Sequence, residues 1–262
     1  LDTAEYVEIT GKGENQTNMQ VQLAAISNPE KQTKFENCVA DVNIPLGEVF
    51  TSPKLAGTNG ILNVGTVYIG DIQYRNLRME FKDGRVVSAV CDNFVENGVI
   101  DQEAGHRLIV QGIMNGHETL PLGEFAIGTN TTAYAMAEKF GILDRLPILI
   151  VEKMGPHFAV GDTCYSWSED SPMYNPDGKE MIARDNEVSI LRKEDVSKAY
   201  FGVHTDITIP YKELERISAV HTDGTKIDII LDGRFVLAGL DDDPGTVLPF
   251  NGGPLGGRMV VL

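Results

Sequence analysis

The sequence of 262 residues predicts an α+β fold, in which a curved, mainly antiparallel sheet forms a cradle or partial barrel with a few helices. Three observations lead to this prediction. Short runs of alternating apolar and polar residues lie towards both ends of the chain, Asp-Gly pairs separate several of these runs, and helical spacing is confined to the middle. The chain does not show the regular alternation of strands and helices that is typical of a doubly wound parallel sheet.

The alternating runs indicate half-buried strands, because successive side chains of a strand point to opposite faces of a sheet. The predicted strands cover residues 6–9, 19–23, 67–69, 77–81, 86–90, 226–231 and 234–238. Asp-Gly pairs suit the positive φ angles of tight hairpin turns. We therefore expect antiparallel hairpins to turn at Asp83-Gly84, Asp223-Gly224 and Asp232-Gly233.

Two segments in the middle of the chain have apolar residues at intervals of three or four. They run from Asp101 to Met114 and from Thr132 to Phe140, and they predict two helices. Gly141 follows the second segment at the place where a glycine often ends a helix. The polar stretch from Asp162 to Asn186 predicts a long loop, and the stretch rich in Gly and Pro from Pro244 to Gly257 predicts a surface tail.

The charge balance argues against two classes of partner. Lys and Arg number 22 against 38 Asp and Glu, which gives a formal net charge of -16. This charge repels the phosphate backbone of nucleic acids and anionic lipid surfaces. No apolar run is long enough to span a bilayer, because Glu152 and Lys153 end the run that starts at Leu146. We expect neither nucleic acid nor membrane as a partner.

The cysteines and the start of the chain suggest a compartment and a domain boundary. Cys38, Cys91 and Cys164 are far apart and form no CxxC pair, so we expect free thiols in a reducing compartment. Together with the missing secretion signal, this predicts a cytoplasmic protein. Because the chain begins at Leu1 and enters a predicted strand almost at once, we expect it to be a fragment of a longer protein.

One pair of residues has the spacing of neighbouring metal ligands on a strand. His204 and Asp206 are two residues apart, and residues 207–209, Ile-Thr-Ile, indicate that they lie on a strand. Positions i and i+2 of a strand share a face, so an imidazole and a carboxylate would stand side by side. On its own such a pair is as often accidental as functional.

Two glutamates and a third residue, His157, stand in unusual surroundings. Glu48 and Glu124 each follow a glycine and precede two apolar residues, which predicts partial burial, and neither has Lys or Arg as an obvious partner nearby in the sequence. A buried carboxylate needs a cation or hydrogen-bond donors, and a metal ion would supply the charge. His157 begins a short apolar strand between Gly155 and Gly161, where an ordinary hydrogen-bonded histidine is the alternative interpretation.

Taken together, five segments resemble a known family. They are NIPLGEVFTSP, MEFKDGRVV, LGEFAIGTN, HFAVG and HTDITIPY. Their order and approximate spacing are similar to those of the metal-binding domain of the thermophilic aminopeptidase family of metallopeptidases, from about residue 5 to about residue 240. Carried over residue by residue, the resemblance implies that two divalent cations are held by Glu48, Glu124, His157, His204 and Asp206.

The resemblance also implies a reaction and a partner. Two divalent ions of zinc, cobalt or manganese would activate a water and polarise the scissile carbonyl of a peptide. Glu124 would act in catalysis as the carboxylate shared by the ions, and Tyr165 would donate a hydrogen bond to the developing oxyanion. The expected partners are a peptide substrate and a second copy of the chain in a homodimer.

The sequence departs from the family at three points. The family tyrosine stands seven residues after the strand histidine, whereas Tyr165 stands eight residues after His157. The stretch between His157 and His204 is longer than in the familiar members. The N-terminal α/β domain of the family is missing, so residues 1–262 are interpreted as the metal-binding catalytic domain.

Three functions follow, in order of preference. The first is an aminopeptidase that removes N-terminal residues by two-metal hydrolysis. The second is a ring-cleaving dioxygenase of the same fold, in which His157, His204 and Asp206 would hold one iron ion. The third is a non-catalytic binding domain. The presence of both Glu48 and Glu124 favours the two-metal site, because an iron site of three ligands does not need them.

Overall fold

The larger of the two main sheets is antiparallel throughout. The computed structural model describes residues 1–38, 47–165 and 171–237 of the chain. Eight strands follow one another in the order β17-β16-β15-β1-β2-β6-β7-β8, and every neighbouring pair is antiparallel. Their bounds are β1 (Ala4–Gly11), β2 (Asn18–Gln22), β6 (Lys54–Ile69), β7 (Ile72–Lys82), β8 (Arg85–Val90), β15 (Leu214–His221), β16 (Lys226–Leu231) and β17 (Arg234–Phe235).

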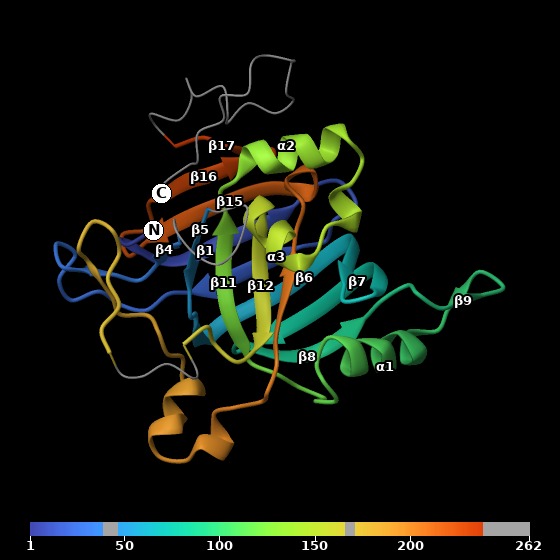
Figure 1. Ribbon diagram of the computed structural model, residues 1–262, viewed down its shortest axis with the longest axis horizontal. Coiled ribbons are helices and arrows are strands. Elements are labelled where there is room, and N and C mark those ends of the chain that lie inside the picture. Colours follow the sequence, from blue (N-terminus) through green and yellow to red (C-terminus); the bar gives the residue numbers. More distant parts are fainter. Residues whose placement is uncertain (39–46, 166–170, 238–262) are drawn as a thin grey trace.

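A second antiparallel sheet has five strands in the order β14-β12-β11-β5-β4. They are β4 (Glu36–Cys38), β5 (Glu48–Thr51), β11 (Leu122–Gly128), β12 (Pro156–Gly161) and β14 (His204–Thr208). In Figure 1, β11 and β12 cross in front of the strands of the larger sheet. The main core joins the two sheets and contains Ile9 and Leu62 of the larger one together with Phe125 and Phe158 of the smaller.

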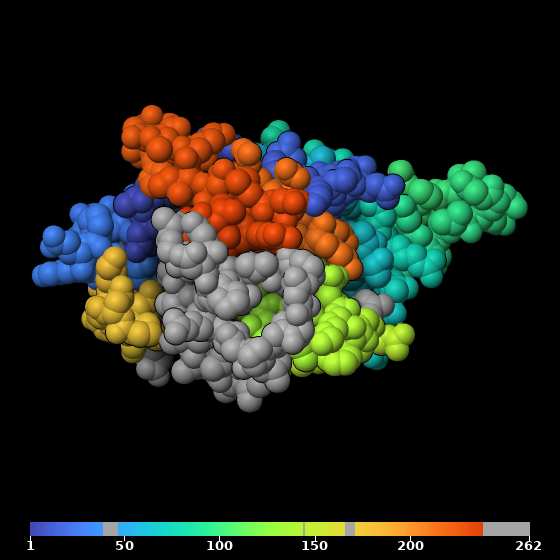
Figure 2. Space-filling view, turned by 90° about the horizontal axis from the view of Figure 1, so that it is seen from above, coloured from blue at the N-terminus to red at the C-terminus, as the bar shows by residue number. Residues whose placement is uncertain are grey.

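Two short sheets complete the strands. β9 (Val95–Glu96) and β10 (Val99–Ile100) form a hairpin, which projects from the body of the molecule in both Figure 1 and Figure 2. β3 (Gln32–Thr33) pairs in parallel with β13 (Glu180–Met181), which lies inside the long loop predicted from Asp162 to Asn186. The predicted tail from Pro244 to Gly257 lies outside the described residues.

The predicted helices are present within one or two residues of their expected bounds. α1 (Gln102–Gly112) starts after Asp101, whose side chain accepts a hydrogen bond from the backbone of Ala104, and α2 (Thr131–Lys139) is capped in the same way by Asn130. Gly141 has a φ of 61°, as expected for the glycine after a helix. The remaining helical elements are short: α3 (Ile148–Val151), η1 (Leu143–Arg145), η2 (Glu152–Met154), η3 (Ser189–Lys193), η4 (Val196–Lys198) and η5 (Tyr211–Glu213).

All three Asp-Gly pairs lie in hairpin turns. Both residues have positive φ at Asp83-Gly84 and at Asp232-Gly233, whereas in the longer turn between β15 and β16 only Gly224 does. The α+β fold class and the mainly antiparallel pairing are therefore confirmed, and both main sheets are open rather than closed into a barrel. Among the described helices, none has the length and apolarity needed to cross a membrane.

Candidate metal centre

The register of the smaller sheet puts the predicted ligands of three strands on one face. Residues that pair directly across two strands point to the same side. Ala159 of β12 pairs with Glu124 on one side and with Asp206 on the other. His157 lies two residues before Ala159, and His204 lies two residues before Asp206, so all four side chains share this face.

Glu48 joins the same face from the next strand. It pairs with Gly128 of β11, four residues after Glu124, so the two carboxylates point to the same side. The opposite face carries Phe125 and Phe158, which pack in the main core. The sequence therefore sorts alternate side chains into a core face and a ligand face.

A β-bulge at Gly123 brings Glu124 onto the ligand face. Leu122 pairs with Val160, but the next pair is Glu124 with Ala159, so β11 carries one extra residue. In a regular strand Glu124, two residues after Leu122, would share the face of Leu122, which is buried in the main core. A side chain at Gly123 would meet the backbone of the loop, since an added Cβ would lie 2.2 Å from the carbonyl oxygen of Asp162.

The five predicted ligands converge, and the Glu124 carboxylate lies between two imidazoles. On one side, Nε2 of His157 is 3.4 Å from Oε1 of Glu124 and 3.3 Å from Oε2 of Glu48. On the other side, Nε2 of His204 is 3.2 Å from Oε2 of Glu124 and 3.5 Å from Oδ1 of Asp206. Each oxygen of the Glu124 carboxylate therefore faces one imidazole.

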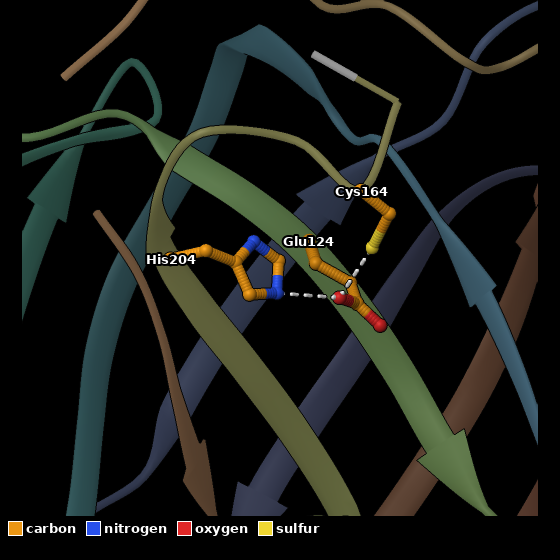
Figure 3. A group of neighbouring side chains, drawn as sticks. All are labelled: Glu124, Cys164 and His204. Atoms are coloured by element: carbon orange, nitrogen blue, oxygen red, sulfur yellow. Dashed lines mark hydrogen bonds and ion pairs between the residues drawn. The ribbon is translucent and has the colours of Figure 1, made fainter. Parts of the chain in front are cut away.

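Two groups of three donors could each hold an ion in the described part of the chain. One is Glu48, Glu124 and His157, which are all buried, and the other is Glu124, Cys164 and His204. Figure 3 shows the second group, with the thiol of Cys164 and the imidazole of His204 both directed at Glu124. Sγ of Cys164 lies 2.8 Å from Oε2 of Glu124. Asp206 belongs to neither group.

Both histidines turn the same nitrogen towards the cluster. Nδ1 of His204 lies 2.6 Å from the carbonyl oxygen of Asp162, and Nδ1 of His157 lies 3.4 Å from that of Gly155. At His204 the short contact with a backbone carbonyl favours a proton on Nδ1 and leaves Nε2 to face the carboxylates, and the ring of His157 is oriented in the same sense by a longer contact. This is the arrangement in which a histidine can bind a metal ion through Nε2.

The donor atoms fit a metal ion better than they fit one another. The four distances from imidazole to carboxylate are 3.2 to 3.5 Å, at or beyond the long end of the usual N–H···O range of about 2.7 to 3.2 Å. Two ligands that bind one tetrahedral zinc ion at about 2.0 to 2.2 Å stand about 3.3 to 3.6 Å apart. In the described part of the chain, no group donates a hydrogen bond to Oε2 of Glu48 or to Oδ1 of Asp206, and both atoms are buried.

Charge and burial act in opposite directions on these groups. Burial disfavours the charged forms, but the imidazoles of His157 and His204 outweigh it and hold the pKa of Glu124 well below its ordinary value of 4.5. Burial likewise opposes protonation of the two histidines, whereas the neighbouring carboxylates raise the pKa of each well above 6.5. Without an ion the cluster is therefore stabilised by protonated imidazoles.

Glu48 has no basic neighbour in the sequence, but the fold brings a lysine from 105 residues further along the chain to it. Lys153, which is 2% exposed, forms ion pairs with Glu48 and, at 3.0 Å, with Glu152. Burial lowers the pKa of Lys153, but the two carboxylates outweigh it and raise the pKa above its ordinary value. Gly128 pairs with Glu48 across β11 and β5, and because it has no side chain the backbone of η2 can approach it closely. An added Cβ would lie 2.4 Å from the carbonyl oxygen of Glu152.

Tyr165 lies on the ligand face but makes a different contact. Its ring stacks on Phe50 at a centroid distance of 5.9 Å, and its hydroxyl donates to Glu36, which pairs with Phe50 across β4 and β5. The residue seven positions after His157 is Cys164, and the thiol of that residue lies in the cluster. The catalytic role of Tyr165 stays a prediction.

Sequence reasoning missed three residues beside the centre: Glu152, Lys153 and Cys164. The signal for the first two was a pair of charges directly after the apolar run from Leu146 to Val151, which is unusual for residues that prove to be buried. The only signal for Cys164 was its distance along the chain from His157. Neither signal could be interpreted until the structure showed that these residues lie beside the predicted ligands.

Comparison with known proteins places this domain in a family of metalloproteases. The sequence model of the thermophilic metalloprotease family (M29) matches residues 1–235. The chain belongs to this family, which confirms the resemblance seen in the sequence motifs.

A solved structure shares the fold. AmpT from Thermus thermophilus matches with a TM-score of 0.56 and 18% sequence identity, over 89% of this chain and 50% of that one. At this identity the likeness concerns the fold, and the chain spans half the length of the structure that it matches. No curated protein sequence matches the chain.

Proposed function

We propose that the chain carries the catalytic metal centre of a two-metal aminopeptidase, which removes N-terminal residues from peptides. The observation that supports this most directly is the position of Glu124 between His157 and His204, one imidazole on each carboxylate oxygen. Membership of a metalloprotease family supports a peptide as the substrate. The domain assignment to residues 1–262 is part of the same proposal.

Each side of the centre would use its own residues. Glu48 and His157 would hold the first ion, His204 and Asp206 would contribute to the second, and Glu124 would join the two. When bound, such a pair of divalent ions lowers the pKa of a water and polarises the scissile carbonyl. Lys153 forms buried ion pairs with both Glu48 and Glu152, and it thereby offsets their charge and helps to hold the two carboxylates in place.

The substrate would approach from the side of His204. The side chain of His204 is 30% exposed and Cys164 is exposed, whereas the side chain of His157 is 2% exposed. The free amine of a peptide would therefore meet the second position first, and the first position would stay enclosed. Tyr165 would have to exchange its bond with Glu36 before it could donate to the oxyanion of a substrate.

The alternative of one iron ion held by two histidines and Asp206 is less well supported. Such a site needs both imidazoles on one ion. In this chain His157 and His204 fall into separate groups of donors, on opposite oxygens of Glu124. The expected homodimer, the cytoplasmic location and the choice among zinc, cobalt and manganese stay predictions.

The decisive experiment is Glu124→Gln, which keeps the size of the side chain and removes its charge. Elemental analysis should find two divalent ions per chain in the native protein and one or none in the variant. Cleavage of a leucine anilide should fall by more than the roughly 10- to 100-fold that loss of a supporting residue costs. Glu138→Gln, an exposed glutamate paired with Lys212, is the matched control.

Two outcomes would overturn this proposal. If Glu124→Gln keeps both ions and normal peptide cleavage, Glu124 is a structural carboxylate. If the native protein holds a single iron ion and cleaves no peptide, the dioxygenase alternative replaces the aminopeptidase.

A further inference from the structure

Cys164 has no assigned role, although its thiol lies at the open side of the centre. Sγ is 2.8 Å from Oε2 of Glu124, the same oxygen that faces Nε2 of His204 at 3.2 Å. The three donor atoms lie within 4.8 Å of one another. Carboxylate oxygen, imidazole nitrogen and thiolate sulfur are each ligands that zinc binds in proteins.

The thiol is directed at the centre by the loop that follows β12. Asp162 accepts hydrogen bonds from the backbone of Phe201 and Gly202 through its side chain, and its carbonyl oxygen holds Nδ1 of His204. Asp162 thus links the loop that carries Cys164 to the segment that carries His204. The next residue, Tyr165, turns away onto Phe50, which leaves the thiol on the side of Glu124.

We propose that the sulfur of Cys164 is a ligand of the second metal position, beside Glu124 and His204, and that this position prefers zinc-like ions to manganese. This inference rests on the proposed metal centre. As the bond between sulfur and metal forms, the proton of the thiol passes to solvent, since a coordinating thiol is deprotonated. Thiolates favour soft ions such as zinc, whereas sites made only of oxygen ligands suit magnesium and manganese.

The two positions would then differ in chemistry. Among the described residues, the donors of the first position are oxygen and nitrogen atoms of Glu48, Glu124 and His157, and all three side chains are buried. The second has a sulfur donor and faces solvent. Two ions of different kinds could therefore occupy the centre, with the softer one at the side from which substrate approaches.

Cobalt provides a direct test, because a thiolate bound to Co²⁺ gives an intense near-ultraviolet charge-transfer band that carboxylates and imidazoles do not give. The protein is stripped with chelator, kept in a reductant without thiols and titrated with Co²⁺, while absorption and cobalt content are measured. The native protein should show the band and two ions per chain. Cys164→Ala and Cys164→Ser should lose the band, and their affinity for zinc at one position should fall at least about 10-fold.

Cys91→Ala is the matched control, because the Cys91 thiol is buried beside α1 and contacts the carbonyl of Gly105. This variant should keep the band, and circular dichroism should confirm that all variants are folded. Two bound cobalt ions without the band would overturn the role of Cys164 and leave the metal centre standing. A native protein that binds no cobalt would overturn both.

Discussion

Replacing Lys153 with methionine removes a buried ammonium group while keeping a side chain of similar length. Lys153, Glu48 and Glu152 have side chains that are 2%, 7% and 7% exposed, so solvent cannot take over the lost charge. Breaking a buried ion pair by removing one partner costs about 3 to 5 kcal/mol. At roughly 2 to 4 °C for each kcal/mol in a domain of this size, the melting temperature of the chelated protein should fall by about 6 to 20 °C.

Scanning calorimetry in chelator and then in zinc tests the reason as well as the size of this loss. A divalent ion beside Glu48 replaces the missing positive charge, so zinc should stabilise Lys153→Met more than it stabilises the native protein. Saturation at 100 times the dissociation constant contributes about 2.7 kcal/mol. Zinc should therefore recover a large part of the lost stability.

Lys212→Met is the control, because Lys212 and its partner Glu138 are 58% and 38% exposed. An exposed pair contributes about 0 to 1 kcal/mol. If the two variants melt within 2 °C of each other (about 0.5 to 1 kcal/mol), Lys153 does not compensate the buried glutamates, and the electrostatic argument for Glu48 is refuted.

Three further predictions concern the bulge, the histidines and the tyrosine. Gly123→Ala should move β11 away from the loop and displace Glu124, so the variant should bind less zinc per chain and melt earlier; unchanged zinc content would contradict the role of the bulge. In chelator, the raised pKa values of His157 and His204 stabilise the folded protein fully below the ordinary value of 6.5, and this stability is lost as the pH rises through the raised values. The lowered pKa of Glu124 acts in the opposite sense and contributes stability above 4.5. The melting temperature in zinc minus that in chelator should thus grow from pH 6 to pH 9 (a span of roughly three units), and a constant difference would argue against metal binding by the imidazoles. Tyr165→Phe should lower kcat by about 100-fold or more if the hydroxyl serves the oxyanion, and a change in stability alone would assign it to Glu36.

The periodicity of the sequence was sufficient for much of the fold. Alternating runs placed β1, β7, β8 and β16, and the Asp-Gly pairs placed three turns, because both signals are local. The extent of β6, which continues from Lys54 to Ile69, was underestimated because its first half contains three glycines or asparagines that weaken the strand pattern. In the first half of β6, pairing with β2 and β7 outweighs the low strand propensity of these residues.

The centre was predictable only in part. The five candidate ligands came from motifs, and the structure brings all five together. The bulge at Gly123 was not predicted, because an extra residue in a strand has no periodic signal of its own. The ion-pair partner of Glu48 was missed because Lys153 lies 105 residues further along the chain and reaches Glu48 only through the close approach of η2 to Gly128.

The division of the smaller sheet into two faces has a consequence for how such a protein can change. Ala126 and Ala159 lie among the ligands, whereas Phe125, Phe158 and Ile207 on the other face support the core. Substitutions at the first set alter the surroundings of the ions without changing the residues that pack between the two sheets. Evolution or laboratory selection could therefore change metal preference and reaction on one face of this sheet, one alternate residue at a time, while the residues of the core face stay the same.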